Sequence, residues 1–313
     1  MAQSAFDDVH FNDEAAAFAY VESKLWPHGP VCPHCGNADP QRIRKMEGKT
    51  TRLGLYNCNE CRKPFTVRQG TIFQSSHLPL RFWLQVIHLM CSSKKGVSTN
   101  QVQRMLSCSM KTAWFLTHRI REAMRDGSLA PMGGSGSVVE IDETYIGRKD
   151  GFEVRRGASH KNAVLTLVER EGRARSFHIE NATKEQIIPI VRENVARESH
   201  VMTDEANRYA RFGHEFAGHG VVDHSRGEYG YTDRETGMSI STNTVEGFYS
   251  VFKRGMVGVY QRCGEQHLHR YLAEFDFRYS YRQKLGFDDS ARAEHALLRV
   301  KGKRLTYETT AHR

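Results

Sequence analysis

Four cysteines in two closely spaced pairs carry the most specific chemical pattern in the sequence. Cys32 and Cys35 form one C-x-x-C pair, and Cys58 and Cys61 form a second pair after an interval of 22 residues. Each pair presents two thiolates to one ion, and tetrahedral zinc takes four such ligands. The spacing predicts a zinc ribbon whose zinc is structural, since four thiolates leave no open coordination position. His34 is a possible substitute ligand, and a redox pair is the alternative interpretation.

Three acids on separate segments form the second group that could do chemistry. Asp142 interrupts an apolar, strand-like segment, Asp204 ends a later one, and Glu246 lies on a helix-like segment. Carboxylates from separate segments suit Mg²⁺, and two such ions clamp the attacking and leaving oxygens of a phosphoryl displacement. Taken alone, each acid is more simply a cap, a turn or a surface residue. Their spacing along the chain, 62 and then 42 residues, together with an adjoining basic region, favours a metal site.

The positions of these acids within their segments predict which way they face. On a strand, Glu140 and Asp142 share one face and Glu143 faces the other. On a helix over 242–254, a polar face with an arc of about 80° is predicted at 100° per residue. Its members are Asn243, Glu246, Ser250 and Lys253.

The basic residues are concentrated rather than spread evenly. The net charge is +9, and the window from Arg62 to Arg125 holds eleven Lys or Arg against one acid. The segment from Lys253 onward adds thirteen basic residues against seven acids. Such concentration favours a polyanion partner over a solvated basic face, because each neutralised phosphate releases counterions.

The elements of the N-terminal half are predicted to be mostly helical. A helix over 12–26 has Asn12 as its cap, residues 65–67 close the ribbon as a strand, and a helix covers 79–92. Helices over 100–106 and 110–124, joined by a turn at 107–109, match a helix-turn-helix. The second of these helices would enter the major groove, with Ser109, Lys111 and Thr112 as candidate base readers.

A Gly- and Ser-rich linker at 131–137 precedes a change to strand-like patterning. Strands are predicted over 138–146, 162–169, 173–180, 200–204 and 221–224, with helices over 183–196, 242–254 and 267–282. This order predicts an α/β domain, a mixed sheet flanked by helices, that carries the acids.

Length and composition exclude several classes. The 313 residues suggest two or three domains, and 39% hydrophobic residues can form a core. No window contains the roughly 18 unbroken apolar residues of a membrane span. We expect no export signal, and the odd count of seven cysteines argues against a disulfide framework. A cytoplasmic, nucleoid-associated protein is expected.

Several stretches together resemble one family, the DDE-type transposases of bacterial insertion sequences in their zinc-ribbon, ISXO2-like group. The matching stretches are residues 26–36, 61–67, 141–147, 200–209, 222–229, 241–255 and 271–280. The resemblance implies an RNase H-like fold, Asp142 and Asp204 as magnesium ligands, and two catalytic Mg²⁺, with Mn²⁺ as a substitute. In the family the third ligand is either Asn or Glu, followed by a Lys.

Both candidates for the third ligand occur here. We favour Glu246 because a charged oxygen binds Mg²⁺ more strongly than a neutral amide, and Asn243 would then orient a ligand or touch DNA. Lys253 is expected to contact a phosphate. His224, expected on a short strand, is either a donor beside the ligands or a core histidine.

The resemblance implies a function in DNA transposition. The substrates would be the element's terminal inverted repeats and a target DNA, bound by a dimer or larger oligomer, without a membrane. Water would hydrolyse the phosphodiester at the element end, and the freed 3′-hydroxyl would attack target DNA by transesterification. The alternatives are a non-catalytic, zinc-dependent DNA-binding regulator and an RNase H-like nuclease without strand transfer.

The expected organisation follows from these assignments. Residues 1–30 form an N-terminal helical segment, 31–70 the zinc ribbon, 71–130 the helix-turn-helix-like region, 131–137 the linker, 138–285 the catalytic domain and 286–313 a basic tail. The candidate DNA-binding residues are Lys94, Lys95, Arg104, Ser109, Lys111, Thr112, Arg119 and Arg254.

Overall fold

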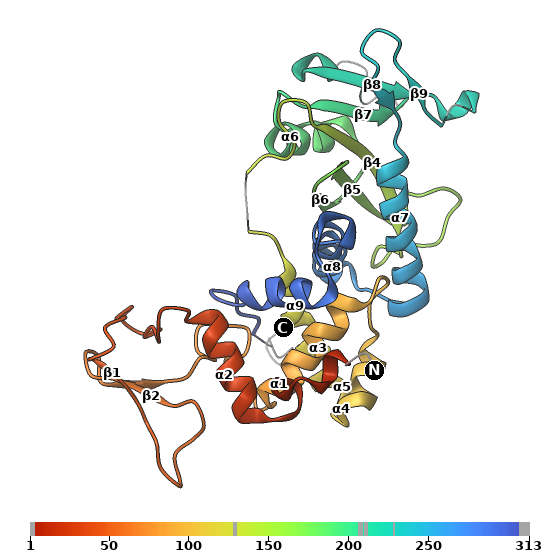
Figure 1. The fold of residues 1–313 in the computed structure, drawn as a ribbon. Helices are drawn as coiled ribbons and strands as arrows, with labels where there is room; N and C mark the ends of the chain where they lie inside the picture. Colours follow the sequence, from red (N-terminus) through yellow and green to blue (C-terminus); the bar gives the residue numbers. More distant parts are fainter. Residues whose placement is uncertain (1–3, 128–129, 206–208, 210–211, 228, 307–313) are drawn as a thin grey trace. The chain divides into compact units, whose positions relative to one another are not determined.

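The computed structural model of the chain describes residues 4–127, 130–205, 209, 212–227 and 229–306 and divides into two compact units (Figure 1). Unit 1 comprises Met1–Ser93, Val97–Met124 and Asp288–Arg313. Unit 2 comprises Lys94–Gly96 and Arg125–Phe287. Within the described ranges, no helix is both long and apolar enough to cross a bilayer.

Unit 1 begins with two consecutive helices, α1 (Val9–Asn12) and α2 (Glu14–Leu25). The cap of α2 is Asp13, whose carboxylate accepts a hydrogen bond from the backbone of Ala16 at 2.8 Å. The prediction that Asn12 caps this helix is therefore wrong. Asn12 ends α1, and its amide donates to the carbonyl of Phe6.

The zinc ribbon is a small antiparallel sheet of β1 (Ile43–Lys45), β2 (Tyr56–Cys58) and β3 (Lys63–Phe65). Its closing strand lies two residues earlier than the predicted segment 65–67, because Tyr56 pairs with Phe65 and Cys58 with Lys63. Buried side chains from each strand form a cluster around the cysteines: Cys32, Ile43, Tyr56, Cys58 and Phe65.

Three further helices of unit 1 are α3 (Leu80–Ser92), α4 (Thr99–Leu106) and α5 (Met110–Met124). Ser98 caps α4 by accepting from the backbone of Gln101 at 3.1 Å. Ser107 ends α4 in the left-handed conformation, with φ of +48°, which turns the chain into α5. The predicted helix-turn-helix pair is confirmed as a structure.

The last part of the chain returns to unit 1. Residues 286–313 were expected as a basic tail, but they contain helix α9 (Asp289–Leu298), which packs against α3. The buried guanidinium of Arg292 donates to the carbonyl of Cys91 at 2.7 Å. Part of the basic charge of this segment therefore stabilises unit 1 from within.

Unit 2 is built on a five-stranded sheet in the order β6-β5-β4-β7-β8. The strands are β4 (Val138–Ile146), β5 (Asn162–Glu169), β6 (Ala174–Ile179), β7 (His200–Asp204) and β8 (Gly218–Val222). The first three strands in sequence pair in antiparallel fashion, whereas β7 pairs with β4 in parallel and β8 pairs with β7 in parallel. This mixed sheet confirms the predicted RNase H-like α/β fold.

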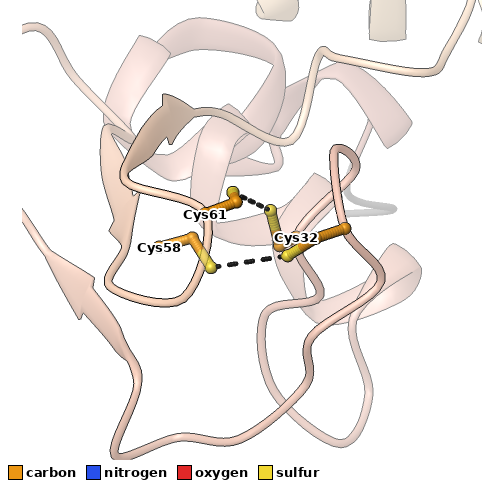
Figure 2. Close-up of side chains that lie close together, drawn as sticks. Cys32, Cys58 and Cys61 are labelled. Carbon is orange, nitrogen blue, oxygen red and sulfur yellow. Dashed lines mark hydrogen bonds between the residues drawn. The ribbon is translucent and has the colours of Figure 1, made fainter.

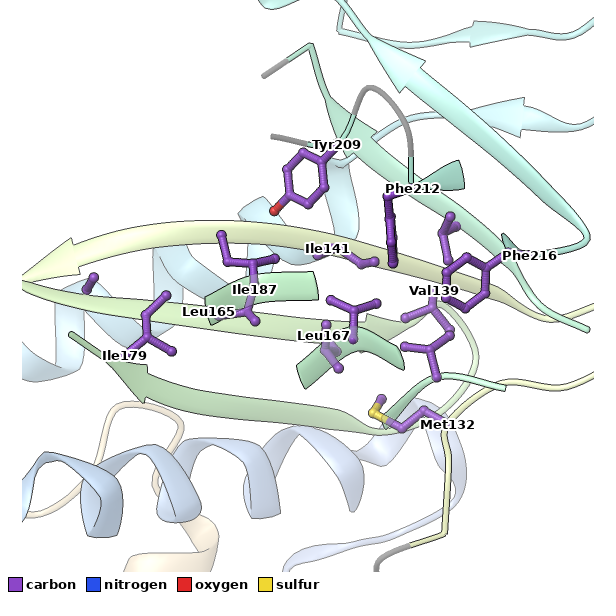
Figure 3. Close-up of a cluster of buried hydrophobic side chains, with 14 residues drawn as sticks. Met132, Val139, Ile141, Leu165, Leu167, Ile179, Ile187, Tyr209, Phe212 and Phe216 are labelled. Carbon is purple, nitrogen blue, oxygen red and sulfur yellow. The ribbon is translucent and has the colours of Figure 1, made fainter. Parts of the chain in front are cut away.

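Helices cover both faces of this sheet. On one face, α6 (Lys184–Asn194) packs through Ile187 onto Ile141, Leu165 and Leu167, a cluster shown in Figure 3. On the other face, α7 (Asn243–Gly255) and α8 (Leu268–Ser280) pack onto the alternate side chains of β5. Since side chains alternate along a strand, Glu140 and Asp142 lie on the α7 face and Glu143 on the α6 face.

The connection from β8 to α7 differs from the prediction. β8 ends at Val222, so the predicted strand 221–224 is displaced towards the N-terminus, and His224 lies in a short helical turn. A small hairpin of β9 (Tyr231–Thr232) and β10 (Ser239–Ile240) follows. This hairpin was not predicted, because its strands have two residues each.

Candidate carboxylate and zinc sites

The pairing of β4 with β7 brings the first two acids to the same edge of the sheet. Glu140 is paired with Met202 in parallel register. Asp142 and Asp204 each lie two residues beyond this pair, so both carboxylates project from the same face. Neighbouring strands are about 4.8 Å apart, which places the two acids close together.

Helix α7 supplies the third acid. Its apolar side chains are buried on the sheet, and Asn243, Glu246, Ser250 and Lys253 are all exposed, as expected for one polar face. The hydroxyl of Tyr249 donates to the carbonyl of Asp142 at 2.6 Å. Glu246 lies one turn before Tyr249, so this bond ties the helix to the strand beside the acids.

Burial and the neighbouring acids both affect the ionisation of Asp142. Burial raises the pKa of Asp142 to about 7, and the charge of Glu143 contributes to the same shift. The backbone N–H of Glu143 donates to Asp142 at 2.7 Å and opposes the shift. The charges of Asp204 and Glu246 raise the pKa further, because each disfavours a second negative charge nearby.

Glu246 lies beside two polar groups. The hydroxyl of Thr242 donates to its carboxylate at 3.0 Å, and Nε2 of His224 lies 3.3 Å from the same oxygen. His224 Nε2 is also 3.2 Å from the Thr242 hydroxyl. His224 is only partly buried, so it is not a core histidine, and its position beside Glu246 fits the predicted donor.

The donor set fits divalent cations. Asp204 and Glu246 disfavour a negative charge on Asp142, and a cation between these carboxylates would reverse that repulsion. Among the described residues, only the four cysteines form a group of three or more potential ligands within 4.8 Å of one another. Asp142, Asp204 and Glu246 do not form such a group in this structure.

Asn243 and Lys253 lie at opposite ends of the polar face. Asn243 is the first residue of α7, directly after Thr242, which also contacts Glu246. Lys253 is seven residues beyond Glu246, about 10 Å along the helix axis. Its exposed ammonium lies 5.9 Å from the centre of the Tyr249 ring.

The four cysteines form a closed site (Figure 2). The Sγ atoms of Cys32 and Cys61 are 3.6 Å apart, and those of Cys35 and Cys58 are 3.7 Å apart. Tetrahedral zinc with bonds of about 2.3 Å separates its sulfurs by about 3.8 Å, so the spacing fits zinc. The backbone N–H of Cys61 lowers the pKa of Cys58 to about 6, which favours the thiolate, whereas burial raises the pKa of Cys61.

His34 does not belong to this group. Its Nε2 lies 3.4 Å from the carbonyl of Pro64, and four sulfurs already complete a tetrahedron. The alternative ligand suggested by the sequence is therefore not needed.

The predicted DNA-contacting residues of unit 1 fall into two groups. Arg104, Ser109 and Lys111 are exposed, and Ser109 also caps the start of α5, since its hydroxyl accepts from the backbone of Thr112 at 3.1 Å. Arg119 is buried, and its guanidinium donates to the carbonyls of Ile72, Gln74 and Leu305. This bonding contradicts the prediction that Arg119 contacts DNA.

The remaining predicted contacts lie together in unit 2. A Cβ on Gly255 would lie 2.6 Å from the carbonyl oxygen of Lys95, so glycine permits the segment 94–96 to pack against the end of α7. Lys94, Lys95 and Arg254 are exposed there together with Lys253.

Two contributors to the site were missed in the sequence. Thr242 and Tyr249 both bond to the acid cluster, but each reads as an ordinary cap or core residue. Only the fact that both flank Glu246 on a helix could have indicated them. Glu140 was placed on the correct face, but its partner Arg170, at 2.7 Å, was not anticipated.

Two domain families match the chain. The ISXO2-like transposase domain matches residues 133–280, and the transposase zinc-ribbon domain matches residues 12–64. The first range contains all three acids of the cluster, and the second contains all four cysteines.

A relative and a solved structure are also similar. An uncharacterized protein in transposable element ISH50 of Halobacterium salinarum is 25% identical over 293 residues, which cover 88% of this chain and 94% of the relative. A cryo-EM structure of the simian T-cell lymphotropic virus intasome with PP2A regulatory subunit B56 gamma is 13% identical, with a TM-score of 0.29. This match covers 56% of the chain and spans 63% of the matched chain. The low TM-score gives this likeness no weight.

Proposed function

The chain belongs to the zinc-ribbon group of ISXO2-like insertion-sequence transposases, and from this membership we propose that it cleaves and joins DNA at the ends of its element. The observation that supports the proposal is the register of β4 and β7, which puts Asp142 and Asp204 on the sheet face covered by α7, the helix that bears Glu246 and bonds to Asp142 through Tyr249. Two carboxylates on one sheet face and a third on the helix that covers it are a suitable site for two Mg²⁺.

Each acid has a defined task in this proposal. Asp142, at the centre of the sheet, would be the central ligand of the cations, and Asp204 and Glu246 would hold them with it. Bound Mg²⁺ would supply the charge that activates the attacking oxygen and stabilises the leaving oxygen. The hydroxyls of Thr242 and Tyr249 and the ring of His224 hold the acids in place. No residue forms a covalent bond to DNA.

The DNA would be held by both units. Lys253, with Arg254, Lys94 and Lys95, provides phosphate contacts around the carboxylates. Lys111 and Arg104 on the helix-turn-helix pair, together with the ribbon, bind the terminal inverted repeats. Since two element ends must be joined to one target, a dimer or larger oligomer assembles on DNA.

The test is a cleavage and strand-transfer assay on the full chain with zinc retained. The substrate is a labelled duplex containing the DNA that flanks the gene, with a plasmid as target. In Mg²⁺ we expect 3′-hydroxyl ends at the element boundary and joined products. Asp142→Asn and Asp204→Asn should each lower both products by more than about 100-fold. Altering a residue that only supports the ligands usually costs about 10- to 100-fold.

Asp276→Asn is a matched control. Asp276 is a buried acid of α8 that bonds to the backbone and hydroxyl of Ser176 on β6, which is separated from β4 by β5. It should leave both products unchanged. Binding without cleavage by the wild-type chain would identify a DNA-binding regulator, and cleavage without joining would identify a nuclease.

A further inference from the structure

Glu140 is a completely buried carboxylate that the proposed chemistry does not use. It lies two residues before Asp142 on β4, on the same face of the sheet. A buried charge is unfavourable unless it is paired and hydrogen-bonded, so its partners indicate why this position is occupied by an acid.

All the acceptor positions of Glu140 are occupied. Oε2 accepts from the backbone N–H groups of Thr244 at 2.7 Å and Val245 at 2.9 Å. Oε1 accepts from the Thr244 hydroxyl at 2.8 Å and from Nε of Arg170 at 2.7 Å. An ionised carboxylate has about four lone-pair sites, so none remains for a metal ion.

These bonds perform the task of a helix cap from another element. The first N–H groups of a helix have no partner within the helix, and the N-cap residue Thr242 makes no capping bond with its side chain. Glu140 satisfies the second and third N–H groups of α7 instead, and its charge is favourable at a helix N-terminus. The start of α7 is thereby fixed to the strand that carries Asp142.

Arg170 holds the segment that leads into α7. Its guanidinium donates to the carbonyls of Ser239 at 2.6 Å and Ser241 at 3.0 Å, as well as to Glu140. Arg282, just after α8, donates to the carbonyls of Gly172 and Arg170 in the same turn. The turn between β5 and β6 is therefore a fixed support for Arg170.

We propose that Glu140 and Arg170 are positioning residues that set the rotation and height of the first turn of α7, and so hold Glu246 opposite Asp142. A helix that slips by one residue rotates by 100° and moves by 1.5 Å, which would turn Glu246 away from Asp142. The inference rests on the proposed function, since it concerns the third carboxylate of that site.

The primary variant is Glu140→Gln in the full chain. It keeps the shape of the side chain but replaces one acceptor oxygen with an NH₂ group, which cannot accept from the surrounding donors. The first readout is Mn²⁺ binding, measured by electron paramagnetic resonance of the free ion, and the second is cleavage as a function of Mg²⁺ concentration. Each readout has a midpoint, the Mn²⁺ concentration at half-saturation and the Mg²⁺ concentration at half-maximal cleavage. We expect both midpoints to rise by about 10- to 100-fold, with cleavage recovering at high Mg²⁺. A loss of folding alone would lower the active fraction without moving either midpoint.

Glu274→Gln is the matched control. Glu274 is equally buried and bonds to Arg278 within α8 and to Tyr260 in the turn after α7, so the substitution removes the same charge from the same unit without touching the first turn of α7. We expect it to lower the melting temperature while both metal midpoints stay at the wild-type values.

Arg170→Lys is the second variant, for the case in which Glu140→Gln does not fold. Lysine retains the charge but cannot bond to Glu140, Ser239 and Ser241 together, so a smaller rise in both midpoints is expected. Wild-type midpoints in each folded variant would overturn the inference. If the wild-type chain binds Mn²⁺ but cleaves no DNA, the proposed function fails, and the Mn²⁺ midpoints alone decide the positioning role.

Discussion

The ionisation of Asp142 depends on its burial and on the neighbouring acids. Burial and the surrounding acids raise its pKa from the ordinary value near 4 to about 7. The folded state therefore binds this proton more tightly than the unfolded state. Its stabilising contribution is complete below pH 4 and is lost as the pH rises through 7.

Asp142→Asn should consequently stabilise the magnesium-free protein at alkaline pH. We expect a gain in unfolding free energy on the order of a few kcal/mol at pH 8, and almost none at pH 4. Urea unfolding at both pH values, with zinc retained, measures this gain. Adding Mg²⁺ at pH 8 should stabilise the wild type and not the variant. If the unfolding free energies of the two proteins changed equally with pH, folding would not raise the pKa of Asp142.

At the residue scale, either Glu246 or Asn243 is the third Mg²⁺ ligand. If Glu246 binds Mg²⁺, Glu246→Gln should reduce cleavage and joining by orders of magnitude, because it removes a negative ligand. DNA binding in Ca²⁺ should stay near the wild-type level, and Mn²⁺ should restore part of the activity.

Asn243→Ala is the companion variant, because both residues are exposed on the same face of α7. It should be only mildly impaired, and the melting curves of both variants should match the wild type. An inactive Asn243→Ala with a fully active Glu246→Gln would assign the ligand to Asn243 and leave the transposase assignment intact.

Sequence patterns predicted these residues only as far as local geometry allows. The opposite faces of Asp142 and Glu143 follow from strand alternation, and the polar face of α7 follows from the helical repeat. The role of Glu140 depends on bonds to residues more than 100 positions away. Arg119 was misassigned because helical spacing does not reveal that neighbouring backbone carbonyls surround its side chain.

At the scale of elements, the zinc ribbon is held together by its four sulfurs around a small cluster of apolar residues. We expect one zinc per chain, and Cys58→Ser should lower the zinc content and unfold the ribbon, because folding of so small a sheet depends on the metal. Metal analysis and limited proteolysis measure both effects.

Cys108→Ser is the control for the ribbon variant, since Cys108 lies in the turn between α4 and α5, outside the cluster. It should retain the full zinc content. A chain that is folded at 31–70 without zinc would contradict a structural role for the metal.

The helix-turn-helix pair separates DNA contacts from structural cations. Lys111→Ala should weaken DNA binding, because an exposed cation near the start of α5 is lost. The slope of the logarithm of the affinity against the logarithm of the salt concentration should become shallower by about one unit. Arg119→Gln should instead lower the melting temperature and leave the slope unchanged, since its donors bond to backbone carbonyls. Binding isotherms at several salt concentrations distinguish these outcomes. Equal slopes for Lys111→Ala and the wild type would remove Lys111 from the interface.

The long elements were predicted well, and the short ones poorly. The strand over 138–146 and the helix over 110–124 have strong periodic patterns, and both have the predicted bounds. The β9–β10 hairpin and the displaced β8 are too short for a pattern to develop. Asp13 displaced Asn12 as a cap because a separate short helix, α1, ends at Asn12.

At the scale of the whole molecule, the chain consists of a zinc-ribbon and helical unit and an RNase H-like unit. The sequence indicated the change of pattern at the linker, but not that residues 288–313 cluster with unit 1. Their contribution to unit 1, through the bond from Arg292 to Cys91, is a tertiary contact between residues 201 positions apart. The concentration of positive charge also overstated the DNA-binding surface, because Arg119, Arg121 and Arg292 are buried.

The central claim is that Asp142, Asp204 and Glu246 hold the metal ions together, and iron-mediated backbone cleavage tests it most directly. Fe²⁺ replaces Mg²⁺ in the zinc-loaded chain bound to DNA. Ascorbate with peroxide then generates radicals that cut the polypeptide backbone near the ion. We predict cuts beside residues 142, 204 and 246, abolished by excess Mg²⁺ and by Asp142→Asn. Cuts confined to other segments, or an unchanged pattern in Asp142→Asn, would contradict the claim.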